Sequence, residues 1–327
     1  MDPLEAFGRA LFTTLVYPGL LFLALLGLVS QWYRRKLVAR LQNRVGPKYV
    51  GPLGILQPFA DVYKLLFVKE LVTGLYTPAK LLTYTLVLGM VALAASTVLL
   101  PISPLFIGTD YDVLVFIYLT LYASIAFAIT GLGSASPYPI LGGVRYVTMM
   151  LAFEPAIAMS LIAMVRTLAP GTLSIAEALS RPRILYGDPL LTIAQAFTLV
   201  TAGVSLAIAL LSKAMLKPFD IPEAETEVAG GYLAELSGPA LGLGILLHEV
   251  ELTLFLLVLS NLLIPVPPMS PDTLGVVASL LKYLAVLTTL VIVAYSMGRV
   301  KLDQALKSLV KIPLPLSFIS LVISFLT

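Results

Sequence analysis

The chain has 327 residues, of which 59% are hydrophobic and 12% charged, and its mean hydropathy is +0.98. This composition, with apolar runs longer than about 18 residues, is typical of a multi-spanning membrane protein and excludes a soluble enzyme. The net charge of +3 is small, and no basic stripe accompanies exposed aromatic residues, so we expect no nucleic-acid partner. Because the chain has no cysteine and one histidine, we expect no iron–sulfur cluster, bis-histidine haem or metal site within it. Its two asparagines and five glutamines favour a thermophilic source.

Eight apolar segments each approach the ~20 residues that a helix needs to cross a bilayer. They predict an all-α fold with a single polytopic membrane domain over residues 1–327. The predicted spans are residues 11–32, 81–101, 112–132, 145–165, 190–212, 239–263, 273–297 and 310–326.

Lysine and arginine are concentrated in alternate connections between these spans. The connections after spans one, five and seven, with the start of span four, carry 16 of these residues, and the other side carries four. Because basic loops remain on the cytoplasmic side, the count predicts that these three connections face the cytoplasm. A multi-pass protein of the cell membrane with both termini outside is therefore expected.

The first cytoplasmic connection, residues 33–80, begins with basic residues and contains two Gly-Pro turns. Apolar residues then recur at helical spacing from Ile55 to Leu66, with Asp61 and Lys64 on one face. This pattern predicts an amphipathic interfacial helix, since the segment is too short and too charged to span. A simple membrane anchor is one interpretation. Nine basic residues against two acidic ones in this connection favour a docking surface for a soluble partner.

The connection at residues 213–238 contains the stretch "PFDIPEAETEVAGGYLAEL", Pro218 to Leu236, which holds five of the 18 acidic residues. Pro222 is typical of a first helical turn, where acidic side chains are favoured. A helix beginning there places Glu223 and Glu227 on one face and Glu225 on another. The adjacent glycines end the helix soon afterwards. A solvated acidic loop is the simpler interpretation, and carboxylates that exchange protons are the functional one.

Span four contains Glu154. An ionised carboxylate at bilayer depth raises the free energy of membrane insertion by on the order of 3 kcal/mol. Glu154 should therefore be paired, hydrated or protonated. A structural ion pair, with Arg145 as the candidate partner, and a proton-exchanging role both fit this position. The one histidine, His248, lies in span six, where we expect a polar contact inside the bundle or a place on a proton path.

Four motifs occur along the chain in a fixed order: an Arg-Lys pair, then "NRVGPKYVGPLGILQPFADVYKLLFVKE", "VRYVTMMLAFE" and "PFDIPEAETEVAGGYLAE". Together they resemble the H-type subunit of respiratory complex I, the counterpart of mitochondrial NADH dehydrogenase subunit one, which also has relatives in archaeal ferredoxin-oxidising membrane complexes. The resemblance covers nearly the whole chain. It implies a subunit without catalysis of its own, which joins a peripheral electron-transfer arm to an ion-pumping membrane arm. Its implied partners are soluble iron–sulfur and hydrogenase-like redox subunits and antiporter-like membrane subunits.

The resemblance also assigns roles to individual residues. A line of carboxylates leading into the membrane, with one arginine, matches a proton relay; these residues are Arg145, Glu154, Asp220, Glu223, Glu225, Glu227 and Glu235. Glu249 and Glu251 compete for one further position of the relay. The segment that docks the redox arm and forms a quinone-reducing chamber is matched by Arg35, Lys36, Arg40, Arg44, Asp61 and Lys64.

Two departures from the family pattern fall where this chamber would lie. Quinone-using members usually have Glu-Thr-Asn-Arg and a small residue before Pro-Phe-Asp, whereas this chain reads "KAMLKPFD", Lys213 to Asp220. The usual glutamate before Arg-Lys is Arg34 here. These departures put a quinone in doubt and raise a sulfur compound or protons as the terminal acceptor. Because the longer "VGPLG" form of the first connection is complete here, a complex-I-like or sulfur-reducing member fits better than a plain hydrogenase. A free-standing secondary transporter and a passive anchor for an enzyme are the alternatives, although the internal repeats expected of a transporter are absent from the sequence.

Overall fold

The computed structural model describes residues 8, 11–72, 74, 76–103, 108–183 and 189–326, without the side chains of residues 189, 225 and 226. The described residues form helices and no strands, and eight helical segments are long and apolar enough to cross a membrane. The predicted all-α membrane fold is therefore confirmed. The long helices are α2 (Leu20–Leu41), α4 (Ala79–Ser96), α5 (Asp112–Leu132), α6 (Pro137–Leu168), α8 (Pro189–Lys213), α10 (Gly238–Leu263) and α11 (Thr273–Ser296), followed by α12 (Leu302–Lys311) and α13 (Pro313–Leu326).

Three of these segments are longer than the apolar runs predicted. The first helical segment continues to Leu41, and its last turns carry the basic residues that were expected in a loop. Helix α6 begins at Pro137, eight residues before the predicted start of span four. The last segment begins at Leu302 and changes from α12 to α13 before Pro313. Apolar run length marks only the part of a helix that contacts lipid, because Arg and Lys are good helix formers that extend it into water.

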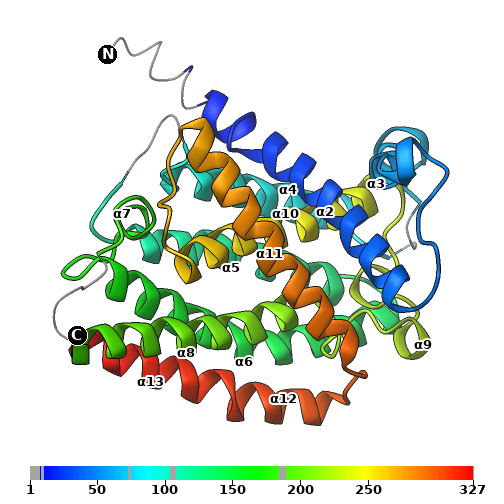
Figure 1. Ribbon diagram of the computed structural model, residues 1–327. Coiled ribbons are helices and arrows are strands. Elements are labelled where there is room, and N and C mark those ends of the chain that lie inside the picture. The colour runs from blue at the N-terminus through cyan, green and yellow to red at the C-terminus, as the bar shows by residue number, and fades with distance from the viewer. Residues whose placement is uncertain are drawn as a thin grey trace.

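Helix α10 lies at the centre of the bundle, and 78% of its apolar window is buried. Helices α2, α4 and α11 pack around it on one side, while α6, α8 and α13 form the other part of the bundle (Figure 1). The short helices α3 (Gln57–Tyr63) and α9 (Glu225–Val228) lie at one end of the bundle, and α7 (Ile175–Ser180) lies at the opposite end (Figure 1). The basic and the acidic connections therefore meet at the same end.

The predicted amphipathic helix is present in the basic connection. After a short 3₁₀ turn at Pro52–Gly54, α3 continues without a break into a π-helical turn at Lys64–Val68. Leu65 and Leu66 from this turn lie against Gly242 near the start of α10. The segment is thus packed onto the central helix of the bundle.

The helix expected from Pro222 onward is shorter than predicted. Helix α9 spans Glu225–Val228, so Glu223 lies before it rather than on a shared face with Glu227. The helix ends because Ala229 and Gly230 both adopt left-handed backbone conformations, with φ of 51° and 97°. The 3₁₀ turn Gly231–Leu233 follows, and Gly231 lies so close to the Pro222 carbonyl that any Cβ would collide with it at 1.7 Å. The acidic segment therefore folds back on itself as a compact loop.

Candidate functional site

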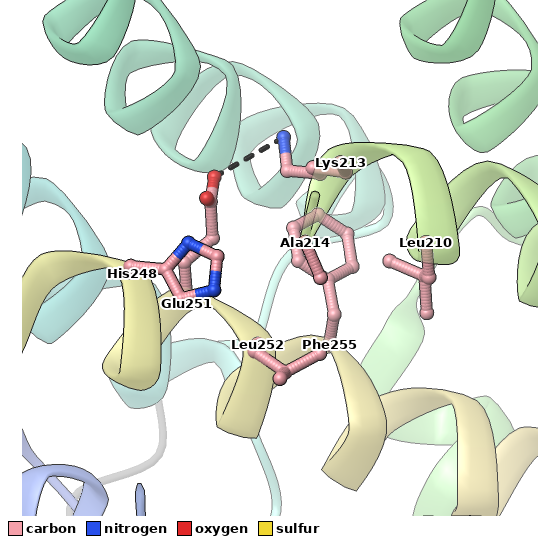
Figure 2. Close-up of a pocket in the computed structure, with 7 residues that line it drawn as sticks. All are labelled: Leu210, Lys213, Ala214, His248, Glu251, Leu252 and Phe255. Carbon is pink, nitrogen blue, oxygen red and sulfur yellow. Dashed lines mark ion pairs between the residues drawn. The ribbon is translucent and has the colours of Figure 1, made fainter. Parts of the chain in front are cut away.

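A buried charge cluster lies where α8 ends inside the bundle. Lys213, the last residue of α8, places its Nζ atom 2.5 Å from Oε1 of Glu154 on α6 and 3.2 Å from Oε1 of Glu251 on α10. The same ammonium lies 2.6 Å from Oγ of Ser124 on α5, and that hydroxyl donates to Glu154 at 2.7 Å. Figure 2 shows Lys213 and Glu251 pointing toward each other from facing helices. Four helices thus converge on one ammonium group.

This cluster is enclosed by protein. The side chains of Lys213, Glu251 and Glu154 are 2%, 3% and 13% exposed. The rings of Phe255 and Phe153 flank the ammonium, with centroids 4.9 and 5.8 Å from Nζ. Two carboxyl groups share one ammonium here in a poorly solvated setting. With both carboxylates ionised the cluster has a net charge of −1, so it can take up one proton and become neutral.

The cluster lies well inside the bundle. Glu251 is 13 positions after Gly238, the first residue of α10, which corresponds to about 20 Å along the helix axis. Since α8 ends beside Glu251, the irregular connection from α8 to α10 starts at this depth. Non-helical backbone at membrane depth occurs where it is buried or lines a watery cavity, and both conditions are met here.

A chamber of about 1020 Å³ opens between the end of α2, α3, the connection after α8 and α10. The ion pair of Arg34 with Glu249 forms part of its wall at 2.5 Å, and Arg299 binds Asp220 at 2.6 Å. Its charged lining residues are Arg34, Arg35, Arg44, Lys48, Lys217, Arg299, Asp61, Asp220, Glu223 and Glu249. The chamber is thus charged, with more basic than acidic groups.

The residues predicted for docking fall into two sets. Arg35, Arg44 and Asp61 line the chamber, and Arg35 pairs with Asp61 at 3.2 Å. Lys36, Arg40 and Lys64 are not among the described residues that line it. Lys36 instead donates to the carbonyl oxygen of Pro47 at 2.8 Å and so holds the first Gly-Pro turn against α2. Arg40 and Lys64 are exposed, as a contact surface for another molecule requires.

The predicted acidic residues also separate in space. Asp220 and Glu223 line the chamber, whereas Glu227 lies outside it and pairs with Arg145 at 2.6 Å. Glu235 lies beside Gly74, and one of its oxygens is buried without a hydrogen-bond partner among the described residues. The side chain of Glu225 lies outside the described part of the structure.

The ion pair considered between Arg145 and Glu154 is not formed. The two residues are nine positions apart on α6, about 13 Å along the axis, so their side chains project at different depths. Arg145 pairs with Glu227 and Glu154 with Lys213. Within the described residues, no group of three His, Asp or Glu side chains is arranged to hold a metal ion.

Residues 14–325 match the sequence pattern of the NADH dehydrogenase family. The chain belongs to this family, in its subunit-one branch. Among solved structures, the chain resembles one in the structure of the membrane-bound sulfane sulfur reductase, described as an archaeal respiratory membrane complex. The similarity covers 98% of this chain and 99% of that one, with a TM-score of 0.78 and 20% sequence identity. The eight-span fold is therefore shared with that structure.

Family membership gives the two sequence departures a structural meaning. In the pattern of quinone-using members, glutamates are expected at two places where this chain has Lys213 and Arg34. Each of these cations binds a carboxylate of α10: Lys213 binds Glu251, and Arg34 binds Glu249. Glu249 and Glu251, the two candidates for one relay position, lie in different places, because residues two apart on a helix face different directions. Glu249 belongs to the chamber and Glu251 to the buried cluster.

Lys213 and Arg34 are the site residues that sequence reasoning did not select. The position of Lys213 after an apolar run predicts a cytoplasmic basic residue, yet its side chain is buried. One signal in the sequence could have identified Lys213. It stands at the end of a span, where the family pattern has a carboxylate, and other spans of the chain contain the glutamates Glu154 and Glu251.

Proposed function

We propose that this chain is the membrane subunit of a complex-I-type redox-driven ion pump, and that it joins the peripheral electron-transfer arm to the ion-translocating membrane arm. It has no catalytic activity of its own. Membership of the NADH dehydrogenase family supports this proposal, as does the shared fold with a chain of a respiratory membrane complex. A free-standing transporter lacks comparable support.

The observation that carries the proposal is the cluster of Glu154, Lys213 and Glu251 beside a charged chamber. The cluster can take up and release one proton while its net charge alternates between zero and −1. Redox chemistry at the chamber that changes charge nearby would shift this balance, because electrostatic interactions are strong where water is scarce. Asp220 and Glu223 on the chamber wall add two carboxylates on the docking side of the cluster.

We propose that the chamber does not hold a tightly bound quinone and that the terminal acceptor is a sulfur compound or protons. Met215 and Leu216 line the chamber where quinone-using relatives have polar residues. The sulfane sulfur reductase that shares this fold supports the same acceptor class. Reduction of a soluble quinone by the intact complex, blocked when Leu216 is replaced by Trp, would refute this part.

The proposed partners are soluble iron–sulfur and hydrogenase-like subunits at the end of the bundle that carries α3 and α9, and antiporter-like subunits within the bilayer. The end with the basic connections is assigned to the cytoplasm, so that both termini lie outside. Large apolar side chains that are exposed in this single chain, such as Tyr49, Phe67 and Val68, provide contact area at the docking end.

Replacing Glu154 with Gln tests the relay in the complete complex in proteoliposomes. This variant leaves Lys213 and Glu251 as a neutral pair, so assembly and electron transfer should continue. Ion movement should fall by about a hundredfold, the lower range of the contribution of a positioned proton-transfer group. Glu177→Gln is the matched control, because Glu177 lies on α7 at the opposite end of the bundle and pairs there with Arg183. Pumping at the wild-type rate by the assembled Glu154→Gln complex would show that Glu154 is structural.

A further inference from the structure

His248 lies between the two cavities of the site. It is on α10 three positions before Glu251, so both side chains project from the same face of that helix. Figure 2 shows them side by side, on the side of the helix that faces Lys213. His248 lines the large chamber together with Glu249, and it also lines a small cavity beside Lys213 and Glu251. It therefore contacts both the watery and the enclosed part of the site.

The wall between the chamber and the cluster contains little else that can exchange a proton. Lys213 and Glu251 line the small cavity but not the chamber. Only Ala214 and His248, of the described residues, line both. The backbone N–H of Ala214 is already bonded to the Leu210 carbonyl. The imidazole is thus the polar side chain available at this point of the wall.

The small cavity matches one water molecule. Its volume of about 10 Å³ is close to the smallest space that admits a water, which also needs two or more polar partners. Lys213, Glu251 and His248 provide such partners in its lining. The Nδ1 atom of His248 is buried and has no hydrogen-bond partner among the described residues. A buried ring nitrogen without a partner is costly, and a water in this cavity would satisfy it.

We propose that His248 transfers protons between the chamber and the buried cluster, a step that rests on the proposed function. The imidazole accepts a proton on one ring nitrogen from water in the chamber and releases the proton of its other nitrogen. Through the water of the small cavity, that proton reaches the carboxylate of Glu251. One proton leaves the chamber and one arrives at the cluster, while the imidazole remains neutral in its other tautomer. A turn of the ring then restores the starting state.

The rival route runs through two phenols. Tyr146 and Tyr232 pack with ring centroids 5.9 Å apart, and both lie within electrostatic reach of Glu223 and Glu251. Tyr232 lies near the side chain of Glu223, and Tyr146 lies near Ser124, although neither hydroxyl makes a direct hydrogen bond in the described part of the chain. Unlike His248, neither phenol lines the chamber or the small cavity. Burial, with the negative charge of Glu223 as a second cause, raises the pKa of the Tyr232 phenol well above its usual value. A phenol donates and accepts at a single oxygen, whereas a neutral imidazole has its donor and its acceptor on two separate nitrogens and can pass a proton from one cavity to the other.

His248→Ala in the complete complex, reconstituted in proteoliposomes, tests this assignment. Internal acidification is followed with a pH-sensitive dye, membrane potential with a voltage-sensitive dye, and electron transfer by consumption of the donor. We expect ion movement per electron to fall by on the order of a hundredfold, and added imidazole, which fits the chamber, to restore part of it. Gln31→Ala is the matched control, since Gln31 lines the chamber but not the small cavity, and it should leave the ratio unchanged.

The outcomes distinguish a failure of the His248 proposal from a failure of the proposed relay on which it rests. A wild-type ratio in His248→Ala, with Glu154→Gln impaired, overturns the role of His248 and leaves the relay standing. A loss in Tyr146→Phe but not in His248→Ala assigns the step to the phenols. A loss in His248→Ala that neither imidazole nor methylimidazole restores also overturns the proposal, because the side chain would then serve only packing. His248→Asn retains a polar side chain of similar shape, and it should be impaired as well.

Discussion

Lys213 and Arg35 both form ion pairs with carboxylates, but one pair is buried inside the bundle and the other is exposed to water. Lys213 is 2% exposed and faces two carboxylates, whereas Arg35 and Asp61 form a pair whose side chains are 49% and 46% exposed. Exposed pairs contribute about 0–1 kcal/mol, because water already solvates both charges. A buried pair that loses one partner strands a charge and costs several times more. The comparison therefore separates charged groups on which the structure depends from those that contribute little to its stability.

A third pair lies between these extremes and shows what makes the cluster special. Arg34 and Glu249 are 10% and 5% exposed, but they are matched one to one. This pair is neutral as it stands, and taking up a proton would leave it with a net positive charge. The cluster around Lys213 has two carboxylates for one ammonium, so it alone of the three can take up a proton and become neutral. Stoichiometry, as well as burial, favours this cluster as the proton-exchanging site.

The largest effect is expected for Lys213→Met. This change leaves Glu154 and Glu251 enclosed together without a cation, at a cost on the order of 3–5 kcal/mol in stability. The chain should assemble poorly, with a lower midpoint of thermal denaturation in mild detergent. Measuring that midpoint, together with recovery of the complex, checks the prediction.

Two further variants make the Lys213 experiment decisive. Lys213→Met combined with Glu251→Gln removes one of the two stranded carboxylates, and much of the lost stability should return. Lys282→Met is the matched control, since Lys282 is also buried but its ammonium contacts the Pro267 carbonyl and the Asn261 amide rather than a carboxylate. Equal losses in Lys213→Met and Lys282→Met would show that burial alone matters and that the shared ammonium does not.

Arg34→Met should have an intermediate effect. It leaves Glu249 without its cation, but the chamber brings water to that carboxylate, so we expect a loss of about 2 kcal/mol, below the range for fully enclosed pairs. The midpoint of thermal denaturation again provides the measurement. Arg34→Lys retains the charge and should recover most of the loss. A loss as large as that of Lys213→Met would contradict the view that the chamber is hydrated.

The sequence predicted the membrane fold well because that fold depends on a local property. The length of an apolar run determines whether a helix can cross the bilayer, and span three, residues 112–132, agrees with α5 to the residue. Where charged residues continue a helix, as in the last turns of α2, run length stops being informative. The motifs identified the family for a similar reason, since they are contiguous stretches of sequence.

The pairing of charges could not be predicted in the same way. Lys213 and Glu154 are 59 positions apart, and their contact depends on how α6, α8 and α10 pack. Sequence proximity suggested Arg145 as the partner of Glu154, but residues nine apart on one helix cannot meet. The five acids from Asp220 to Glu235 similarly looked like one group, but the four whose side chains are described lie in different places.

Arg35→Gln should have the smallest effect on the isolated chain. Its pair with Asp61 is half exposed, and Gln57 also donates to Asp61 at 2.8 Å, so the loss should stay below about 1 kcal/mol. The same substitution in the assembled complex sharpens the comparison. If a redox subunit covers residues 33–80, the pair becomes desolvated there, and Arg35→Gln should lower the stability of the complex more than that of the isolated chain. Equal small losses in both would show that this pair stays in water and that the docking surface lies elsewhere.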